Sequence, residues 1–267
     1  MIYQVHDWDD AYANGAHIPD GDDYPARWTD AAAQFRGKHP LTKIADGDLF
    51  LPQKAPHGLM VFIHGGYWMK TGPSVWSHLA EGALMAGWAC LLPAYTLAPQ
   101  ARIFEMTIQV AEQITLAAGQ TAGPVALTGH SAGGHLAARM ICDDGTLDRS
   151  VTDRITACVP ISPLSDLRSL MRTAMNDTLH LDLPEALSES PALLEPLQGI
   201  PVTTWVGGSE RPEFIRHARL LADVWAGLGV ATDCVIDPGL HHFNVIEALS
   251  RPDTPLMKRL LSYSALR

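Results

Sequence analysis

A serine framed by glycines stands in the segment GHSAGG, where the spacing G-x-S-x-G is formed by Gly129, Ser131 and Gly133. This spacing is typical of a tight turn between a strand and a helix, in which the serine hydroxyl projects clear of the backbone. The helix that follows directs its N-terminal N–H groups at any negative charge that forms nearby. A serine near glycines often marks an ordinary turn, but this placement predicts that Ser131 is a nucleophile for acyl transfer.

A serine hydroxyl needs a base to take its proton and an acid to orient that base. After a G-x-S-x-G turn these partners follow in the chain order Ser, then Asp or Glu, then His. The segment GGSERPEF offers Glu210 and Glu213, and the later HHF offers His241 and His242. We predict His242 as the base, with His241 as its neighbour, and Glu210 as the acid. Glu213 stays the alternative acid, although it also fits the first turn of a helix, where a carboxylate faces the dipole.

The segment HGGYW suggests how a negative oxygen could be stabilised. Acyl transfer passes through a tetrahedral intermediate whose oxyanion needs preorganised N–H donors. We expect these donors to be the backbone N–H groups of Gly66, Tyr67 and Ala132, the residue after the serine. Tyr67 and Trp68 are expected to wall the substrate pocket, with packing in the core as the alternative for either. His64 is expected to brace the loop by hydrogen bonding.

The elements that must position these residues follow from the apolar pattern. Strands are expected at 58–64, 88–95, 124–129, 155–162, 201–208 and 231–239. Helices are expected at 28–36, 75–86, 103–119, 132–144, 213–228 and 243–250. Strands that alternate with helices predict an α/β fold, with a mostly parallel central sheet covered by helices on both faces.

The length of 267 residues fits a single domain spanning 1–267. Residues 1–40 mix Asp, Gly, Pro and aromatic residues, and they predict an irregular N-terminal arm that leads into a short helix. Residues 163–200 are too long for a simple crossover between strands and contain several prolines. We expect them to form a small cap over the sheet.

The composition excludes several classes of function. A formal net charge of −10 argues against a nucleic-acid partner, because phosphate binding needs clustered Lys and Arg. No run approaches the roughly 18 apolar residues of a membrane span, and the first residues do not resemble a secretory signal. Four separated cysteines predict reduced thiols in a cytoplasmic protein. A metal site at His241 and His242 is not expected, because no third ligand completes the set.

Together, HGGYW, GHSAGGHL, GGSERPEF and HHF resemble the α/β-hydrolase superfamily, and within it the hormone-sensitive-lipase-like esterases. The pattern HGGxW, in place of the commoner HGGG, is most similar to the kynurenine formamidase (arylformamidase) group, as is the segment 162–182. The resemblance extends along nearly the whole chain. It implies the α/β-hydrolase fold and the same catalytic triad and oxyanion donors. The family usually has Asp as the acid, where this chain has Glu210.

The resemblance also implies a reaction, namely hydrolysis of N-formyl-L-kynurenine to formate and L-kynurenine, a step of tryptophan catabolism. It implies no cofactor and no metal, a small-molecule substrate and a homodimer. Two alternatives stay open. A carboxylesterase acting on short-chain esters would use the same mechanism, whereas a small-molecule-binding protein could keep the scaffold without catalysis. The presence of a serine, an acid and a histidine in the required order disfavours the second alternative.

Overall fold

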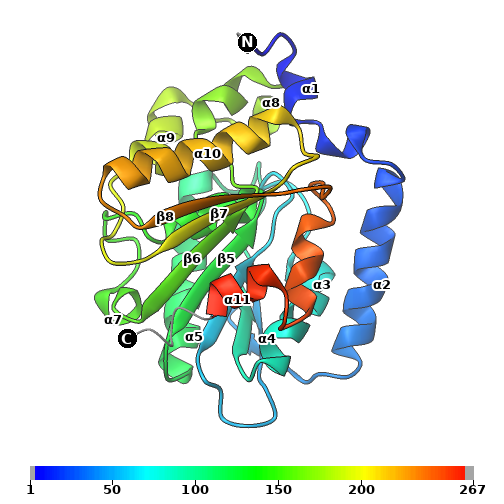
Figure 1. Ribbon diagram of the computed structural model, residues 1–267, viewed down its shortest axis with the longest axis vertical. Helices are drawn as coiled ribbons and strands as arrows, with labels where there is room; N and C mark the ends of the chain where they lie inside the picture. The colour runs from blue at the N-terminus through cyan, green and yellow to red at the C-terminus, as the bar shows by residue number, and fades with distance from the viewer. Residues whose placement is uncertain (1–3, 262–267) are drawn as a thin grey trace.

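The computed structural model describes residues 4–261, and these form an eight-stranded sheet at the centre of the molecule (Figure 1). The strands are β1 (Leu41–Ile44), β2 (Gly47–Phe50), β3 (Leu59–Ile63), β4 (Ala89–Leu92), β5 (Val125–His130), β6 (Ile155–Ile161), β7 (Val202–Gly207) and β8 (Thr232–Asp237). Their order across the sheet is β1-β2-β4-β3-β5-β6-β7-β8. β2 pairs antiparallel with β1 and β4, and the remaining neighbours are parallel. The predicted mostly parallel sheet is confirmed.

The strand β3 shows why both faces of the sheet must be covered. All five of its residues are buried. Leu59, Val61 and Ile63 belong to the apolar core on one face. Met60 and Phe62 belong to the core on the other face. Because side chains alternate along a strand, a continuous apolar run is typical of a strand with helices on both sides.

Helices cover both faces of the sheet (Figure 1). They are α1 (Trp8–Tyr12), α2 (Tyr24–Arg36), α3 (Pro73–Trp76), α4 (Glu81–Met85), α5 (Ile103–Gln120), α6 (Ala132–Arg139), α7 (Arg149–Thr152), α8 (Asn176–Leu179), α9 (Leu183–Ser188), α10 (Pro212–Gly227) and α11 (Pro255–Leu261). Short 3-10 helices are η1 (Asn14–His17), η2 (Gly21–Asp23), η3 (Ser77–Ala80), η4 (Leu167–Arg172), η5 (Pro191–Leu193) and η6 (Val245–Ser250). α5, α6 and α10 pack on one face, and α2, α4 and α11 pack on the other.

Several elements differ from the sequence-based expectation. The helix expected at 75–86 is divided into α3, η3 and α4, and the one expected at 243–250 is the 3-10 helix η6. The helix expected at 132–144 ends at Arg139. The antiparallel hairpin β1–β2 and the helix α11 were not predicted. Among residues 4–261, no helix combines the length and the apolar character that a membrane crossing requires.

The arm and the expected cap lie close to each other. Within the described part of residues 1–40, short helical turns precede α2, so the arm is more regular than expected. Residues 163–200 contain η4, α8, α9 and η5. α1 of the arm contacts both η4 and α10, and it lies near α8 and the N-terminal end of α10 in Figure 1. The arm therefore packs against the expected cap and against the helix that follows β7.

Parallel strands bring the predicted site residues to one edge of the sheet. The loop HGGYW follows β3, Ser131 follows β5, Glu210 follows β7 and His242 follows β8. Because these four strands run in the same direction, the loops after them emerge on the same side.

Candidate active site

Ser131 occupies the turn between β5 and α6, with 2% of its surface exposed. Its φ of 58° lies in the left-handed region, which costs a non-glycine residue about 1–2 kcal/mol. Its backbone N–H donates to the carbonyl of Ile161 at the end of β6, at 2.9 Å. The turn therefore holds its strained conformation through a bond to the neighbouring strand, in the strand–turn–helix arrangement that GHSAGG predicts.

The glycines of this turn are required by close backbone packing. A Cβ atom at Gly129 would collide with the carbonyl of Gly133, and one at Gly133 would collide with the carbonyl of Ile63 in β3. Both collisions are with backbone atoms, which cannot move aside as a flexible side chain can. The glycines of G-x-S-x-G are thus needed because β5, α6 and β3 approach one another closely at this turn.

His242 and Glu210 form a buried pair. Nδ1 of His242 lies 2.6 Å from Oε2 of Glu210. The other carboxylate oxygen, Oε1, accepts hydrogen bonds from Oγ of Ser162 at 2.6 Å and from N–H of Gly207 at 2.8 Å. Because an ionised carboxylate only accepts hydrogen bonds, Nδ1 of His242 carries a proton. In the neutral imidazole Nε2 is then left with a lone pair, which is the state a general base requires.

A second imidazole places His242 beside the serine turn. The ring of His130, the residue before Ser131, lies with its centroid 4.3 Å from the ring of His242. Phe214 packs on the same ring at 4.6 Å. Burial, with a contribution from His242, lowers the pKa of His130 well below its ordinary value. His130 is therefore uncharged at neutral pH and does not repel a positive charge on His242.

The loop HGGYW lies directly against the serine turn. A Cβ atom at Gly65 would lie 2.7 Å from the carbonyl oxygen of His130 and 3.1 Å from Cβ of Ser131. Gly66, Tyr67 and Trp68 have successive positive φ values of 110°, 53° and 57°. Successive N–H groups in such conformations line concave surfaces that attract anions.

Three backbone N–H groups at this place are available to a ligand. Those of Gly66 and Tyr67 donate to no acceptor within residues 4–261. Ala132 is the first residue of α6, where an N–H has no partner inside the helix. The loop beside Ser131 and the first residue of α6 thus carry the three N–H groups that the sequence predicted as oxyanion donors, and that role stays a prediction.

His64 supports this loop. Its Nδ1 donates to the carbonyl of Gly65 at 2.9 Å, and its ring stacks on Tyr95 with centroids 4.4 Å apart. Oγ1 of Thr71, further along the loop, lies 3.3 Å from the same nitrogen. Burial lowers the pKa of His64 to about 4, so that it is neutral at pH 7. These contacts agree with a bracing role.

Trp68 lies in the apolar core. Its side chain is completely buried and meets the ring of His135 edge-on, with centroids 5.1 Å apart. Its position corresponds to the packing alternative, and its burial gives no support to the expected contact with substrate. Tyr67, in contrast, is only partly buried.

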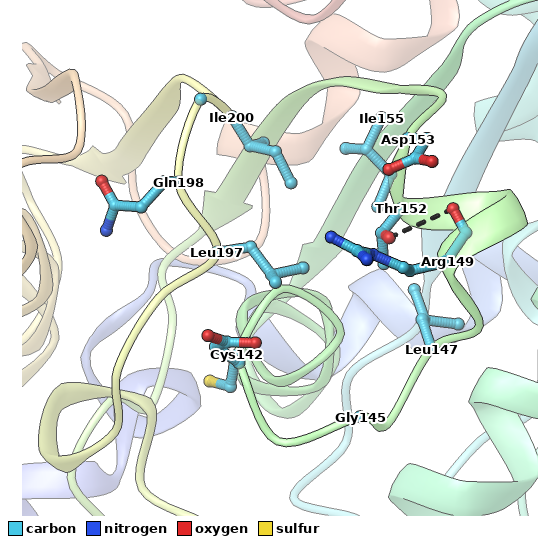
Figure 2. A pocket seen from close by; sticks show the side chains of 12 residues that line it. Cys142, Gly145, Leu147, Arg149, Thr152, Asp153, Ile155, Leu197, Gln198 and Ile200 are labelled. Atoms are coloured by element: carbon cyan, nitrogen blue, oxygen red, sulfur yellow. Dashed lines mark hydrogen bonds between the residues drawn. The ribbon is translucent and has the colours of Figure 1, made fainter.

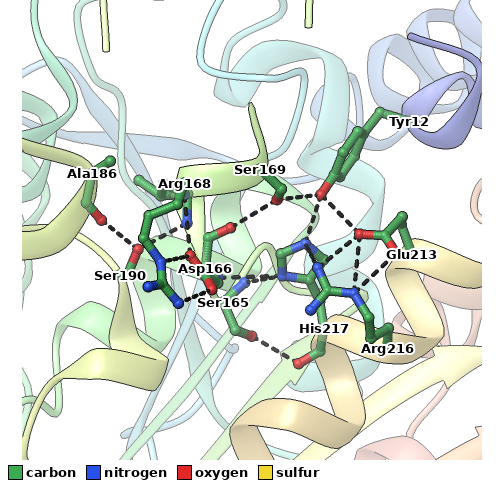
Figure 3. A network of polar contacts seen from close by, with 11 residues as sticks. Tyr12, Ser165, Asp166, Arg168, Ser169, Ala186, Ser190, Glu213, Arg216 and His217 are labelled. Carbon is green, nitrogen blue, oxygen red and sulfur yellow. Dashed lines mark hydrogen bonds and ion pairs between the residues drawn. The ribbon is translucent and has the colours of Figure 1, made fainter. Parts of the chain in front are cut away.

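Glu213 and His241 have hydrogen-bond partners outside the His242–Glu210 pair. Both oxygens of Glu213 accept hydrogen bonds from Arg216, at 2.7 to 3.0 Å, within a network that also contains Tyr12 (Figure 3). Nε2 of His241 lies 3.2 Å from the hydroxyl of Tyr24. Of the two candidate acids, only Glu210 is hydrogen-bonded to His242.

Comparison with known proteins identifies the family. A family model described as alpha/beta hydrolase fold matches residues 60–244, which is well over half of the chain and includes every predicted site residue. The chain belongs to the α/β-hydrolase fold family.

Curated relatives of the hydrolase are named kynurenine formamidase. It is 29% identical over 213 residues to kynurenine formamidase of Salmo salar, an alignment that covers 76% of this chain and 71% of that protein. It is 29% identical over 225 residues to kynurenine formamidase of Danio rerio, covering 80% and 76%. The predicted likeness to this group is confirmed.

Solved structures share the fold. A crystal structure from Silicibacter sp. tm1040, provisionally described as a thioesterase, is 47% identical, with a TM-score of 0.89 over 94% of this chain and 98% of that one. An arylesterase structure is 20% identical, with a TM-score of 0.62 over 91% and 90%. The family model and the curated relatives support an enzyme that hydrolyses amide or ester bonds, and the non-catalytic alternative is set aside.

Two residues of the site were not foreseen. Ser162 ends the segment ITACVPIS, and only its place after a strand at the same edge of the sheet could have indicated a contact with Glu210. His130 is part of GHSAGG, at a position that the pattern G-x-S-x-G leaves open. The signal shared by both is a polar residue at the carboxyl end of a buried strand.

The opposite edge of the sheet carries a cavity of about 720 Å³ (Figure 2). It is lined by residues at the amino ends of β6 and β7, such as Ile155 and Ile200, together with Cys142 and Arg149. Burial raises the pKa of Cys142 to about 12, so this thiol is not a nucleophile. Within residues 4–261, no three or more His, Cys, Asp or Glu side chains are grouped to hold a metal ion.

Proposed function

We propose that the hydrolase acts through Ser131 as nucleophile, His242 as general base and Glu210 as the acid that orients it. The observation that carries this proposal is the hydrogen bond of 2.6 Å between Nδ1 of His242 and Oε2 of Glu210, at the edge of the sheet where Ser131 emerges. It leaves Nε2 as the only basic nitrogen of the imidazole. An acid, a base and a loop with free backbone donors beside one serine support acyl transfer more than any other chemistry.

The reaction then proceeds in two steps. Nε2 of His242 takes the hydroxyl proton as Oγ of Ser131 bonds to the substrate carbonyl carbon. When the tetrahedral intermediate collapses, the bond to the leaving nitrogen or oxygen breaks and His242 returns the proton to it. Water then gives a proton to the same imidazole as its oxygen bonds to the acyl carbon. The bond between that carbon and Oγ of Ser131 breaks, and His242 returns the proton to Oγ, which releases the carboxylic acid and free Ser131.

The oxyanion formed in each step would accept hydrogen bonds from the backbone N–H groups of Gly66, Tyr67 and Ala132. These groups need no rearrangement to do so, because Gly66 and Tyr67 have no acceptor within residues 4–261. A donor of this kind contributes roughly 3 kcal/mol to the transition state. The dipole of α6 adds to the effect, since its N-terminus begins at Ala132.

For the substrate we propose N-formyl-L-kynurenine, cleaved to formate and L-kynurenine. The curated relatives named kynurenine formamidase support this choice at 25–29% identity. The second candidate is a short-chain ester, and the 47% identical protein described provisionally as a thioesterase supports an ester or thioester. A homodimer and a cytoplasmic location stay predictions.

Two measurements test the proposal. The Ser131→Ala variant should lose turnover of every acyl substrate while it keeps the circular dichroism spectrum and melting temperature of the parent, and diisopropyl fluorophosphate should label the parent at Ser131 only. Retained turnover would remove Ser131 as the nucleophile. The kcat/KM values for N-formyl-L-kynurenine, p-nitrophenyl acetate and acetyl thiocholine then rank the substrates, and a large preference for either ester over the formamide would overturn the formamidase assignment.

A further inference from the structure

The N-terminal segment of residues 7–17, here called the strap, crosses the edge of the sheet where the proposed site lies. It consists of α1 and η1, and α1 contacts η4 of the expected cap and α10. At its first residues, the backbone N–H of Ala174 in the cap donates to Oδ1 of Asp9 at 2.7 Å. The strap is therefore bonded to residues far from it in the sequence.

The strap is hydrogen-bonded to the loop HGGYW, residues 64–68, here called the oxyanion loop. The hydroxyl of Tyr67 donates to the backbone carbonyl of Tyr12 at 2.5 Å. Burial raises the pKa of Tyr67 well above its ordinary value, so the phenol keeps the proton that it donates. One of the proposed oxyanion donors thus belongs to a residue whose side chain is attached to the strap.

The side chain of Tyr12 anchors that carbonyl (Figure 3). Two backbone N–H groups donate to Nδ1 of His217, so the proton of this neutral imidazole is on Nε2, which lies 2.8 Å from the Tyr12 hydroxyl. The hydroxyl therefore accepts from His217. Its own proton is available to Oγ of Ser169 at 2.5 Å or to Oε2 of Glu213 at 3.2 Å.

The strap also contacts the loops that carry the proposed acid and base. Arg211, the residue after Glu210, donates from Nε to the carbonyl of Asp10 at 3.1 Å and forms an ion pair with its carboxylate. Its backbone N–H donates to Oδ1 of Asn14 at 3.1 Å. Gly15 faces Phe243, where an added Cβ would lie 3.4 Å from the ring.

The oxyanion loop needs such support because its backbone is strained. Tyr67 and Trp68 both have positive φ values, which a non-glycine residue adopts only when its surroundings enforce it. Trp68 is held by its buried ring and by a bond from N–H of Ala98 to its carbonyl, at 2.8 Å. N–H groups of Met69 and Lys70 donate to the carbonyl of Gly66. For Tyr67, the hydrogen bond from its side chain to the strap holds the strained backbone in place.

We propose that the strap is a positioning element of the active site, in which Tyr12 and Tyr67 hold the oxyanion loop in its donating conformation. The inference rests on the proposed function, because it assumes that N–H of Tyr67 faces the oxyanion. Neither side chain is assigned a part in the chemistry. Their effect is on the transition state, since the loop binds an oxyanion that the ground state lacks.

The test is the Tyr67→Phe variant, which removes one hydroxyl and leaves the ring. We expect kcat to fall by about tenfold or more with little change in KM, because a displaced donor weakens only the transition state. The affinity for phenylboronic acid, which forms a tetrahedral adduct with an active serine, should fall by a similar factor. The matched control is Arg168→Gln, which removes the ion pair between the half-exposed Arg168 and the buried Asp166 at the rim of the Tyr12 network and should leave kcat unchanged.

The Tyr12→Phe variant and the double variant complete the cycle. Tyr12→Phe keeps the carbonyl but removes the anchor, so we expect a smaller loss of kcat and faster hydrogen exchange at residues 7–17. In the double variant, the loss should equal that of Tyr67→Phe alone, because both act through one hydrogen bond. A Tyr67→Phe variant with the kcat and boronate affinity of the parent would overturn the inference while Ser131→Ala stayed inactive. Activity retained by Ser131→Ala would instead overturn the proposed function.

Discussion

Replacing Glu210 with Gln should prevent His242 from acting as a base while leaving the fold intact. The amide of Gln is nearly the same shape as the carboxylate, but one of its two ends donates. At the position of Oε1, N–H of Gly207 points inward at 2.8 Å, together with the hydroxyl of Ser162. A backbone N–H cannot rotate away, so the amide oxygen must occupy that position. The amide NH2 group then faces His242.

The consequence is the wrong tautomer of the base. An NH2 group beside Nδ1 of His242 requires that nitrogen to accept, so the imidazole proton moves to Nε2. Nε2 can then no longer take the proton of Ser131. The corresponding change in a serine protease lowers kcat about 10⁴-fold, which is equivalent to about 5 kcal/mol in the transition state. We expect a loss of roughly 10³–10⁴ in kcat for Glu210→Gln.

The assay is steady-state kcat with N-formyl-L-kynurenine and with p-nitrophenyl acetate, each at pH 7.5, with the melting temperature as a check on folding. Glu213→Gln is the matched control, because it makes the same chemical change three residues away, in a carboxylate bonded to Arg216 instead of His242. It should keep most of its activity. The reasoning is refuted if Glu210→Gln keeps more than about a tenth of kcat, or if Glu213→Gln loses as much.

Two further predictions concern the loop and the buried histidines. Gly65→Ala should lower both stability and kcat, because the added methyl group would lie 2.7 Å from the carbonyl oxygen of His130. Gly72→Ala should change neither, because Gly72 has open space around it and an extended backbone. The melting temperature and kcat of the two variants test this prediction. His64 and His217 have pKa values lowered to about 4, chiefly by burial. Between pH 6.5 and 4 the unfolded state therefore binds more protons, so the free energy of unfolding should fall as the pH falls through this range, by up to about 1.4 kcal/mol per pH unit for each group. Urea unfolding at pH 7.5, 6 and 5 measures this fall in the free energy of unfolding. A midpoint urea concentration that does not change with pH would contradict the prediction.

The sheet and the place of the site could be predicted because both depend on local pattern. Buried parallel strands are continuous apolar runs, and the turn residues between them are glycines that backbone packing requires, as at Gly129 and Gly133. Once strands alternate with helices, their carboxyl ends share one edge, so the loop HGGYW, Ser131 and His242 must converge there. No long-range information was needed for this step.

The hairpin β1–β2 escaped prediction because its pattern is not that of a buried strand. Asp48 lies in β2 with no exposed surface, where a carboxylate is expected only if it is paired. It is paired, with Lys43 across the hairpin at 2.5 Å and with Arg36 of α2 at 3.5 Å. Partners of this kind are visible only after folding. The hairpin turn consists of Ala45 and Asp46, and the dipeptide Asp46-Gly47 at the start of β2 was the sequence signal that could have revealed it.

The distinction between Glu210 and Glu213 shows where sequence reasoning ends. The two carboxylates are three residues apart, and either could reach a histidine after β8. Their separation arises because α10 begins at Pro212 and directs Glu213 toward the strap and Tyr12, while Glu210 remains in the loop before the helix. There N–H of Gly207 and the hydroxyl of Ser162 hold its carboxylate against His242. The family's usual Asp is one methylene shorter, so Glu210→Asp would have to lose either these two donors or the bond to His242, unless the loop moves toward the base. The longer side chain of Glu210 therefore suits the distance between His242 and these two donors, of which only the hydroxyl of Ser162 depends on a side chain.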